Sequence, residues 1–385
     1  MNAPAEIIRR EVARCGVLSF ARFMELALYC PNSGYYEREK DNLGRRGDFY
    51  TSVSTGELFG RLLAFQFANW LEELLALNPQ LATVSIVEAG AHDGQLASDI
   101  LTWLQQSRRR LFEQIEYDIV EPSVRQQGWQ RETLKGFAPH VRWFSNFPEL
   151  ARRGSVASEP PSKRTRISGV IFANELLDAM PVHRLGWDAK NKKWFEWGVT
   201  LENGKFAWAK IETLTTGPGL PDPALCEVLP DGYTIETSPA AENWWREAAN
   251  ILKFGRLLTV DYGLTADELF SPGQPGGTLR AYSRHHTTGD VLANPGEQDL
   301  TAHVNFSTIQ STGEACGLQT EIFSTQAQFL TKVVEKIFKT PELFGGWSAK
   351  QGRQFQTLTH PEHLGHAFRV LIQARLAAIC RPASA

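Results

Sequence analysis

The chain has 385 residues, of which 42% are hydrophobic and 22% are charged, and its formal net charge is −3. This composition is typical of a globular protein, and the length exceeds what one hydrophobic core usually serves, so we expect a main domain with an additional part. The small net charge argues against a general nucleic-acid binder, and no apolar run approaches the ~20 residues that cross a bilayer.

The N-terminus carries Glu6 and Glu11 among its arginines, which fits neither a secretory signal nor an acid-poor transit peptide. The five cysteines are scattered and show no C-x-x-C spacing. Because an odd, unclustered set is typical of reduced thiols, we expect a cytoplasmic protein without a metal site.

The first predicted helix follows Ser19, a suitable N-cap. Its apolar residues recur at helical spacing, at Phe20, Phe23, Met24, Ala27 and Leu28. Farther along, Ser54 and Glu57 have the spacing of a capping box and predict a second helix. We expect residues 1–80 to form a helical extension that acts as a lid or brace.

A polar loop with several glycines precedes this second helix. A loop that ends at a helix N-terminus offers backbone N–H groups to an anion such as a carboxylate. The residues expected to contact a bound ligand here are Gly47, Asp48, Phe49, Thr51 and Ser52. An ordinary surface loop is the alternative.

A strand, a glycine turn and a helix are predicted next. A short apolar run ends at Glu88, the turn contains Gly90 and Gly94, and apolar residues at helical spacing follow. His92 and Gln95 replace two glycines of the dinucleotide fingerprint, so a pyrophosphate cradle is not expected. The turn favours a nucleoside ligand without phosphate, such as S-adenosylmethionine. A glycine turn that only joins a strand to a helix is the alternative.

A second strand over residues 117–121 ends in Glu121, and a third strand is predicted over residues 141–144. An acid about 20–30 residues beyond the first turn accepts hydrogen bonds from ribose hydroxyls in nucleoside-binding α/β folds. Glu121 meets that spacing, although a solvated acid at a strand end would look the same.

The fourth predicted strand, residues 169–173, runs into Asn174, Glu175 and Asp178. An open α/β sheet binds ligands at the carboxyl ends of its strands, where these polar residues lie. Acids of a helix first turn, favoured by the helix dipole, are the alternative for the two carboxylates. The nucleoside site is expected to comprise Glu88, Gly90, Asp93, Gly94, Glu121 and Asn174.

From residue 182 the pattern changes to strand-like alternation, and Asn203-Gly204 between two such runs predicts a hairpin. We expect residues 184–236 to be an inserted antiparallel β excursion that contacts a substrate or partner. Ser238 is expected to cap the following helix, and Gly255 to close it.

A fifth strand over residues 257–263 precedes a long loop that extends to His303. Loops of this length inside a domain are usually functional, so we expect a lid. Its polar and aromatic residues include Tyr282, His285, His286, Asp299, Thr301 and His303. These histidines lack metal-ligand spacing, and no metal is expected.

The last predicted elements are a helix that begins with a capping box at Ser307–Gln310 and ends at Gly317, and a strand over residues 368–372. Together the strands predict an α/β fold with a doubly wound, mostly parallel seven-strand sheet. This domain is expected to comprise residues 81–183 and 237–385.

Five motifs, in order, also carry a family resemblance. They are Phe23-Met24 with Tyr29-x-Pro31 and Gly34-Tyr35-Tyr36; Gly47-Asp48-Phe49-Tyr50-Thr51-Ser52 with Phe59-Gly60; Asn174-Glu175-Leu176-Leu177-Asp178-Ala179-Met180-Pro181-Val182; Asp261-Tyr262-Gly263; and Asp299-Leu300-Thr301-Ala302-His303-Val304-Asn305-Phe306. The chain resembles the family of the mitochondrial complex I assembly methyltransferase and its bacterial homologues, which have the class I, Rossmann-like fold. The resemblance implies S-adenosylmethionine as methyl donor and an arginine of a protein substrate as acceptor. Asn305 stands where the family is expected to have an acid.

The chemistry of arginine methylation then suggests roles. A guanidinium group stays protonated and is a poor nucleophile, but carboxylates that grip it can localise its charge and leave one nitrogen freer to attack. We expect Glu175 and Asp178 to do this, and His303 to take up the departing proton, since an unperturbed histidine titrates near neutrality.

Two alternatives remain open at this stage. Asn174 could hold an amino or amide-like group, which would suit methylation of a small molecule or nucleobase. An assembly factor without turnover could bind the donor or a partner, with the β excursion as its interface. We expect a protein partner, and neither a membrane nor a nucleic acid.

Overall fold

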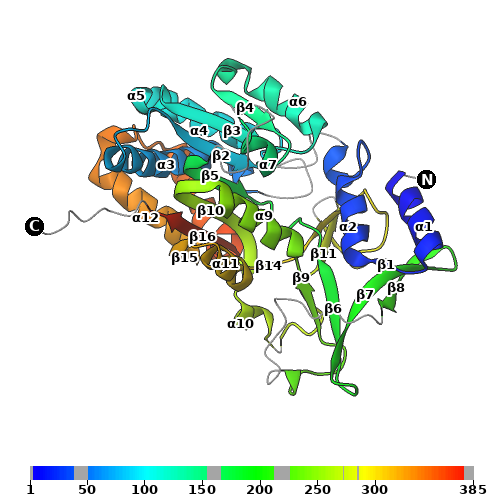
Figure 1. Ribbon diagram of the computed structural model, residues 1–385. Coiled ribbons are helices and arrows are strands. Elements are labelled where there is room, and N and C mark those ends of the chain that lie inside the picture. The colour runs from blue at the N-terminus through cyan, green and yellow to red at the C-terminus, as the bar shows by residue number, and fades with distance from the viewer. Residues whose placement is uncertain are drawn as a thin grey trace, which may run out of the picture. The chain divides into compact units, whose positions relative to one another are not determined.

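The computed structural model describes residues 3–38, 51–153, 166–211, 226–271, 273–283 and 286–376 (Figure 1). The chain divides into two compact units. Unit 1 comprises Met1–Ser54, Glu175–Trp244 and Asp261–Ile309, and unit 2 comprises Thr55–Asn174, Trp245–Val260 and Gln310–Ala385. These divisions differ from the three expected parts, and the functions assigned to those parts stay predictions.

The described helices are α1 (Ala3–Cys15), α2 (Phe20–Tyr29), α3 (Leu58–Leu77), α4 (Gln95–Ser107), α5 (Arg109–Phe112), α6 (Val124–Thr133), α7 (Phe147–Leu150), α9 (Pro239–Ile251), α10 (Ala266–Leu269), α11 (Phe306–Ala315), α12 (Gln326–Lys339) and α13 (Ala349–Thr359). The strands are β1 (Leu18–Ser19), β2 (Val84–Ala89), β3 (Ile115–Val120), β4 (Val141–Phe144), β5 (Ile167–Asn174), β6 (His183–Asp188), β7 (Lys193–Glu202), β8 (Lys205–Ile211), β9 (Thr234–Thr237), β10 (Leu252–Leu264), β11 (Arg280–Ser283), β12 (His286–Thr288), β13 (Asp299–Thr301), β14 (Val304–Asn305), β15 (Gln319–Thr325) and β16 (Phe368–Arg375).

Most of the main sheet belongs to unit 2, and its order is β15-β16-β10-β5-β2-β3-β4, with β14 of unit 1 paired to the end of β10 (Figure 1). Pairing is parallel from β10 through β5, β2 and β3 to β4, and antiparallel between β15 and β16. The predicted doubly wound, mostly parallel sheet is confirmed, but it has eight strands in the described residues rather than seven, because β14 also pairs with β10. The chain runs outward from β2 to β4 and then returns to β5, so the strand order reverses between β2 and β5. Such a switch point is where open α/β sheets bind ligands.

The helix α3 packs against β5, α4, α12 and α13 in unit 2. Most of its apolar residues are buried, Leu77 at its end being exposed, and the ring centroids of Phe67 and Phe172 lie 5.1 Å apart. The predicted capping box at its start does not form. The helix begins at Leu58, after Glu57, whose side chain makes no capping bond, because Ser54 Oγ bonds the backbone of Thr51 instead.

Two glycines let the neighbouring strands β2, β5 and β10 approach closely. A Cβ atom on Gly169 would lie 1.9 Å from the carbonyl oxygen of Ser85, and one on Gly255 would lie 1.8 Å from that of Gly169. Gly255 was expected to close a helix, and that prediction is wrong: α9 ends at Ile251, and Gly255 lies within β10. The close contact between strands is what requires a glycine there.

The predicted antiparallel β excursion is confirmed in unit 1. The sheet order is β1-β7-β6-β9, with β8 paired to β7. Asn203 and Gly204 join β7 to β8 with φ values of 49° and 76°, as a two-residue type I′ hairpin requires. The helix α2 begins at the predicted cap, because Ser19 Oγ accepts a hydrogen bond from Arg22 N. Its apolar face shares a core with Val199 of β7.

The prediction of a long loop after the fifth strand is partly wrong. The structure places three short antiparallel strands there, in the order β12-β11-β13, and the helix α10. Short strands with polar residues and little alternation give no periodic signal, which is why they were missed. His285 lies outside the described residues.

Three predicted helix ends can also be compared. Ser238 Oγ accepts a hydrogen bond from Ala241 N and caps α9 as expected. The capping box predicted at Ser307 does not form, because α11 begins at Phe306 and Asn305 Oδ1, two residues before Ser307, accepts the hydrogen bond from Thr308 N. Gly317, with φ 80°, follows the end of this helix as expected.

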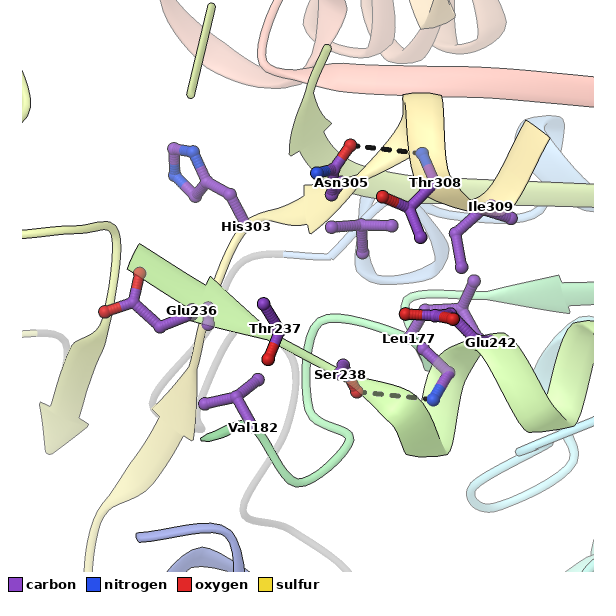
Figure 2. Close-up of a pocket in the computed structure, with 13 residues that line it drawn as sticks. Leu177, Val182, Glu236, Thr237, Ser238, Glu242, His303, Asn305, Thr308 and Ile309 are labelled. Carbon is purple, nitrogen blue, oxygen red and sulfur yellow. Dashed lines mark hydrogen bonds between the residues drawn. The ribbon is translucent and has the colours of Figure 1, made fainter. Parts of the chain in front are cut away.

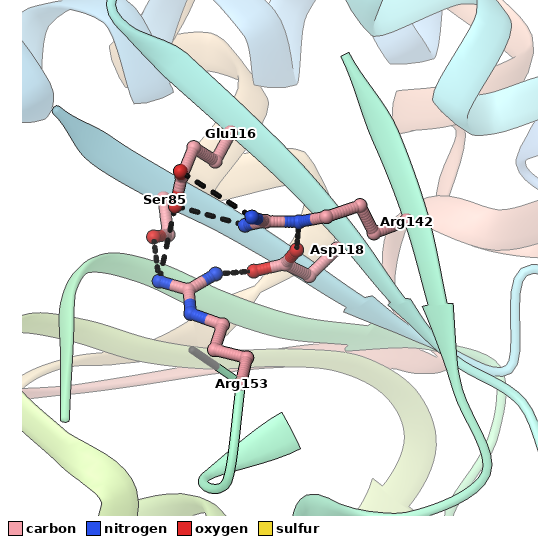
Figure 3. Close-up of polar contacts among 5 residues, drawn as sticks. All are labelled: Ser85, Glu116, Asp118, Arg142 and Arg153. Carbon is pink, nitrogen blue, oxygen red and sulfur yellow. Dashed lines mark hydrogen bonds and ion pairs between the residues drawn. The ribbon is translucent and has the colours of Figure 1, made fainter. Parts of the chain in front are cut away.

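An ion-pair network joins the amino-terminal ends of the strands in unit 2 (Figure 3). The carboxylate of Asp118 is fully buried and binds both Arg142 and Arg153. Arg142 Nη2 also donates to Glu116 Oε2 at 2.8 Å, and Arg153 Nη2 donates to Ser85 Oγ at 2.9 Å. Burial raises the pKa of Asp118 in spite of the two arginines. The two arginines therefore compensate the buried charge of Asp118. Arg153 should contribute more to stability than Arg142, because its side chain is more shielded from water.

We predict that Arg153→Met costs about 3 kcal/mol of unfolding free energy, because it leaves a buried carboxylate short of one partner. The matched change Arg142→Met should cost about 1 kcal/mol, since the Arg142 side chain is 43% exposed and that of Arg153 is 12% exposed. Urea unfolding of the two variants measures the difference. Equal losses would show that burial of the arginine does not decide its contribution.

Candidate functional site

The glycine turn follows β2 at the switch point of the sheet. Its residues Gly90, His92 and Gly94 have φ values of 70°, 47° and 83°. A side chain on Gly94 would press on the backbone of Gln130, since a Cβ atom there would lie 3.3 Å from its Cα. Asp93 Oδ1 accepts a hydrogen bond from Gln95 N at 3.1 Å, which satisfies a free N–H group of the first turn of α4. Asp93, a predicted donor-binding residue, therefore also stabilises the turn.

Gln130 of α6 connects the turn to the next strand, and no pattern in the sequence predicted this. Its Nε2 donates to the carbonyl oxygen of His92 at 3.0 Å and to Glu121 Oε2 at 3.1 Å. Its Oε1 accepts a hydrogen bond from Trp143 Nε1 at 3.0 Å, and the side chain is fully buried. One amide thus fixes the distance between the glycine turn and Glu121.

Glu121 lies directly after β3, as predicted. It is only 3% exposed, so the alternative of a solvated acid is excluded. Its Oε1 accepts a hydrogen bond from Ser123 N at 2.9 Å, and the bond from Gln130 fixes the other oxygen. A carboxylate held at a strand end beside the glycine turn fits the recognition of ribose hydroxyls.

Glu88, the other predicted acid of this site, is buried within β2. Tyr117 Oη donates to Glu88 Oε2 at 2.6 Å. Burial raises the pKa of Glu88 to about 8, and the bond from Tyr117 offsets part of this rise. The side chain therefore carries a proton at neutral pH. Contact between Glu88 and the methyl donor stays a prediction. The same holds for Asn174, the last residue of β5.

Of the predicted ligand-contacting loop, Gly47, Asp48 and Phe49 lie outside the described residues. Thr51 and Ser52 are described and belong to unit 1. Ser52 N donates to Glu175 Oε1 at 2.9 Å. The loop thus supports a predicted catalytic carboxylate, and its contact with a donor stays a prediction.

The segment after β5 is irregular from Glu175 to Pro181, so the alternative that its acids begin a helix is excluded. Glu175 has a φ of 52°, which is uncommon for a residue with a side chain. Tyr29 Oη donates to the carbonyl oxygen of Ala179, and Ala302 N donates to that of Asp178, both at 2.9 Å. The last residue of α2 and the residue that follows β13 therefore hold this segment within unit 1.

Four acids of unit 1 form what we call the carboxylate cluster: Glu175, Asp178, Asp261 and Asp299. Asp261 is fully buried at the end of β10, and Oδ2 accepts hydrogen bonds from Leu176 N at 3.1 Å and Leu177 N at 2.7 Å. Asp299 Oδ1 accepts a hydrogen bond from Tyr36 Oη at 2.7 Å. Asp261 and Asp299 were not predicted as site residues, although both lie in the motifs that carry the family resemblance.

Electrostatics within the cluster oppose full ionisation. Burial raises the pKa of Asp178 well above its usual range, and the charges of Asp261, Asp299 and Glu175 raise it further. Burial also raises the pKa of Asp261 to about 6, although three backbone N–H groups favour its charged form. Such a cluster attracts a cation, because a positive charge relieves the mutual repulsion of the carboxylates.

His303 does not meet the expectation of a pKa near neutrality. Burial and the charge of Arg280 lower its pKa to about 4, so the imidazole is neutral at pH 7. Its ring packs edge-on against Tyr262 with centroids 4.3 Å apart, and Nδ1 is buried with no hydrogen-bond partner in the described part of the chain. This environment makes His303 a weak base, and its role as proton acceptor stays a prediction.

A small pocket of unit 1 lies against the same segment (Figure 2). Leu177, Val182 and His303 line it, together with the capping residues Ser238 and Asn305. Its volume of about 30 Å³ admits water but no arginine side chain. Asn305, which stands in place of an expected acid, therefore serves α11 as a cap beside this pocket.

Across the described ranges, histidine, cysteine and acidic side chains form no group that could hold a metal ion. No helix among those residues has the length and apolar character needed to span a bilayer.

Comparisons with known proteins agree with this geometry. A family model described as a putative S-adenosyl-L-methionine-dependent methyltransferase matches residues 62–324. The protein arginine methyltransferase NDUFAF7, mitochondrial, of Xenopus tropicalis is 27% identical over 83% of this chain and 73% of its own length. Its counterpart from Danio rerio is 30% identical over 77% of this chain and 68% of its own length.

A solved structure from Burkholderia thailandensis is also similar. It is described as a likely methyl transferase bound to S-adenosyl-homocysteine, and it is 30% identical to this chain. The match has a TM-score of 0.78 and covers 97% of this chain and 92% of that one.

The buried proton on Glu88 predicts a pH dependence of stability. The unfolded chain loses this proton near pH 4.5 and the folded protein near pH 8, so stability falls between these values, by at most about 1.4 kcal/mol per pH unit. Glu88→Gln should flatten this slope, because an amide still accepts the bond from Tyr117 without titrating. Urea midpoints across this pH range measure it, with the exposed Glu113→Gln as control. An unchanged slope in Glu88→Gln would contradict the assignment.

Gln130→Met should weaken binding of S-adenosylmethionine about 10-fold, because it frees the glycine turn from Glu121 while keeping the side-chain volume. Gln127→Met is the control, since Gln127 Nε2 donates only to the backbone oxygen of Glu121. Calorimetry measures both affinities. If both variants bind the donor as the parent protein does, the amide of Gln130 does not set the geometry of the site.

Proposed function

Because the chain belongs to the family of S-adenosylmethionine-dependent methyltransferases, we propose that it methylates an arginine side chain of a protein substrate. The reaction class and the donor are those of the family. The choice of arginine is supported by the carboxylate cluster of unit 1 and by the names of the mitochondrial relatives. The single observation that carries the proposal is the cluster itself, since a guanidinium group is the cation that four carboxylates suit best.

The cluster offers an entering guanidinium two accessible acids. Glu175 and Asp178 are partly exposed, whereas Asp261 and Asp299 are buried. Carboxylates that bind part of the planar guanidinium localise its positive charge, which leaves the remaining nitrogen a better nucleophile. Methyl transfer is an in-line displacement, so orienting this nitrogen is the main contribution of the protein.

The donor site is proposed in unit 2. The glycine turn and the buried carboxylate of Glu121 fit a phosphate-free nucleoside, because the turn lacks the glycines that cradle a pyrophosphate. S-adenosylmethionine supplies an activated methyl group when it is bound there. Gly90, Asp93 and Gly94 would surround it, with Glu121 on its ribose.

Two alternatives lead to different outcomes in one assay. Labelled S-adenosylmethionine and the purified protein are added to a lysate from cells that do not make this protein. Arginine methylation leaves the label in protein, where mass spectrometry of the labelled peptides locates it. Label in nucleic acid or in small molecules would favour the alternative acceptors, and binding without transfer would favour an assembly factor. The expected cytoplasmic location stays a prediction.

Glu175→Gln should retain donor binding and lose transfer by about 100-fold or more, because the amide no longer binds the guanidinium as a charge. Calorimetry with S-adenosylmethionine and the lysate assay measure the two properties separately. Glu202→Gln, at the exposed hairpin end of β7, is the matched control and should change neither. Unchanged transfer in Glu175→Gln would remove this carboxylate from the mechanism.

A further inference from the structure

We propose that unit 2 carries a second ligand site, at the amino-terminal edge of its parallel strands, which binds the phosphate group of a small phosphorylated metabolite. This edge is opposite to the one that carries the glycine turn. The proposal concerns binding alone, so it does not depend on which acceptor the protein methylates.

The site is an open cavity of about 360 Å³. Four of its lining residues are each the second residue of a parallel strand: Ser85 of β2, Glu116 of β3, Arg142 of β4 and Ser168 of β5. Because these strands are neighbours in the sheet, their first residues lie along one edge. The volume falls within the range of small-molecule sites, which is about 300–1,000 Å³.

The length of β2 separates this cavity from the proposed donor site. The strand has six residues and, at about 3.3 Å per residue, it spans about 20 Å. The glycine turn follows its carboxyl end, whereas Ser85 lies at its amino end. A ligand in the cavity therefore leaves the donor site free.

Positive charge exceeds negative charge around the cavity. Arg142, Arg153 and Arg166 line it with three positive charges. Two carboxylates oppose them, and Arg142 and Arg153 bind both: Glu116 of the lining and the buried Asp118 (Figure 3). One positive charge is thus left over, and it is that of Arg166.

Arg166 has no carboxylate partner within the described ranges. Its Nη2 donates to the carbonyl oxygen of Asn250 at 3.2 Å, and its side chain is exposed. Burial and the charge of Arg166 lower the pKa of Arg375, a second cation, which donates to the carbonyl oxygens of Ala249 and Cys316. Because the two cations repel each other, an anion beside Arg166 is favoured.

Hydroxyl groups complete the lining. Ser168 is only 9% exposed, and its hydroxyl has no hydrogen-bond partner in the part of the chain that the structure describes. Ser85 Oγ accepts a hydrogen bond from Arg153 Nη2 at 2.9 Å and keeps its own proton to donate. A buried hydroxyl without a partner gains from an acceptor that enters the cavity.

These donors suit a phosphate group better than a carboxylate. They come from several strands, and a tetrahedral phosphate accepts hydrogen bonds in several directions, whereas a carboxylate accepts them in one plane. A guanidinium can bind a phosphate through two parallel hydrogen bonds. A phosphate monoester also carries about −1.5 to −2 charges at pH 7, which compensates the excess positive charge more fully than a single carboxylate does.

Calorimetry with inorganic phosphate at constant ionic strength tests the site in the full chain. Arg166→Met should weaken phosphate binding about 10-fold and Ser168→Ala about 5-fold, because each removes a donor. Arg353→Met is the control, since Arg353 is an exposed arginine of α13 that does not line the cavity, and it should change nothing. The proposal is wrong if the parent protein binds no phosphate at millimolar concentration, or if Arg166→Met binds it as Arg353→Met does. Circular dichroism checks folding, and Ser168→Ala decides if Arg166→Met does not fold.

Two further titrations test the place and the class of the ligand. Protein saturated with S-adenosyl-homocysteine should bind phosphate with unchanged affinity. Competition between the two would place phosphate in the donor site and overturn the proposal. Acetate should bind at least about 10-fold more weakly than phosphate, because it offers fewer acceptor directions and less charge. Equal affinities would overturn the assignment of a phosphorylated ligand.

Discussion

The proposed acceptor site depends on one interaction. The buried carboxylate of Asp261 accepts hydrogen bonds from backbone N–H groups. Its bonds to Leu176 and Leu177 fix an irregular segment that has no helical or strand hydrogen bonds of its own. Glu175 and Asp178 take their positions from that segment. An aspartate buried for packing alone would be costly, so its burial is explained by the backbone donors that it satisfies.

The donor side is built on a different principle. Here the order of the parallel strands brings the ends of β2, β3 and β5 to one edge, and the sheet supplies the frame. Side chains then set the details, since Gln130 ties the glycine turn to Glu121. One site thus relies on a buried charge and the other on a buried neutral amide.

Much of this could be predicted from the sequence. Periodicity located the parallel strands, and Asn203-Gly204 located the hairpin, because both signals are local. Gln130 could not be found, since a glutamine in a polar helix acquires meaning only when the fold brings His92 and Glu121 to it. Asp261 lies inside the fifth predicted strand, but two of its three backbone donors, Leu176 N and Leu177 N, belong to a segment far away in the chain. The pKa of His303 was misjudged because burial cannot be read from residue type.

The positive φ of Glu175 has a consequence for how this chain can change. A residue with a side chain in that conformation costs on the order of 1 kcal/mol, and glycine would relieve the strain. Given the catalytic role proposed for Glu175, stability and activity therefore have opposite requirements at this position. A library screened only for thermal resistance should drift toward glycine at residue 175, and its most stable members would then lack the proposed catalytic carboxylate. Screens for a hardier protein of this kind need to include turnover.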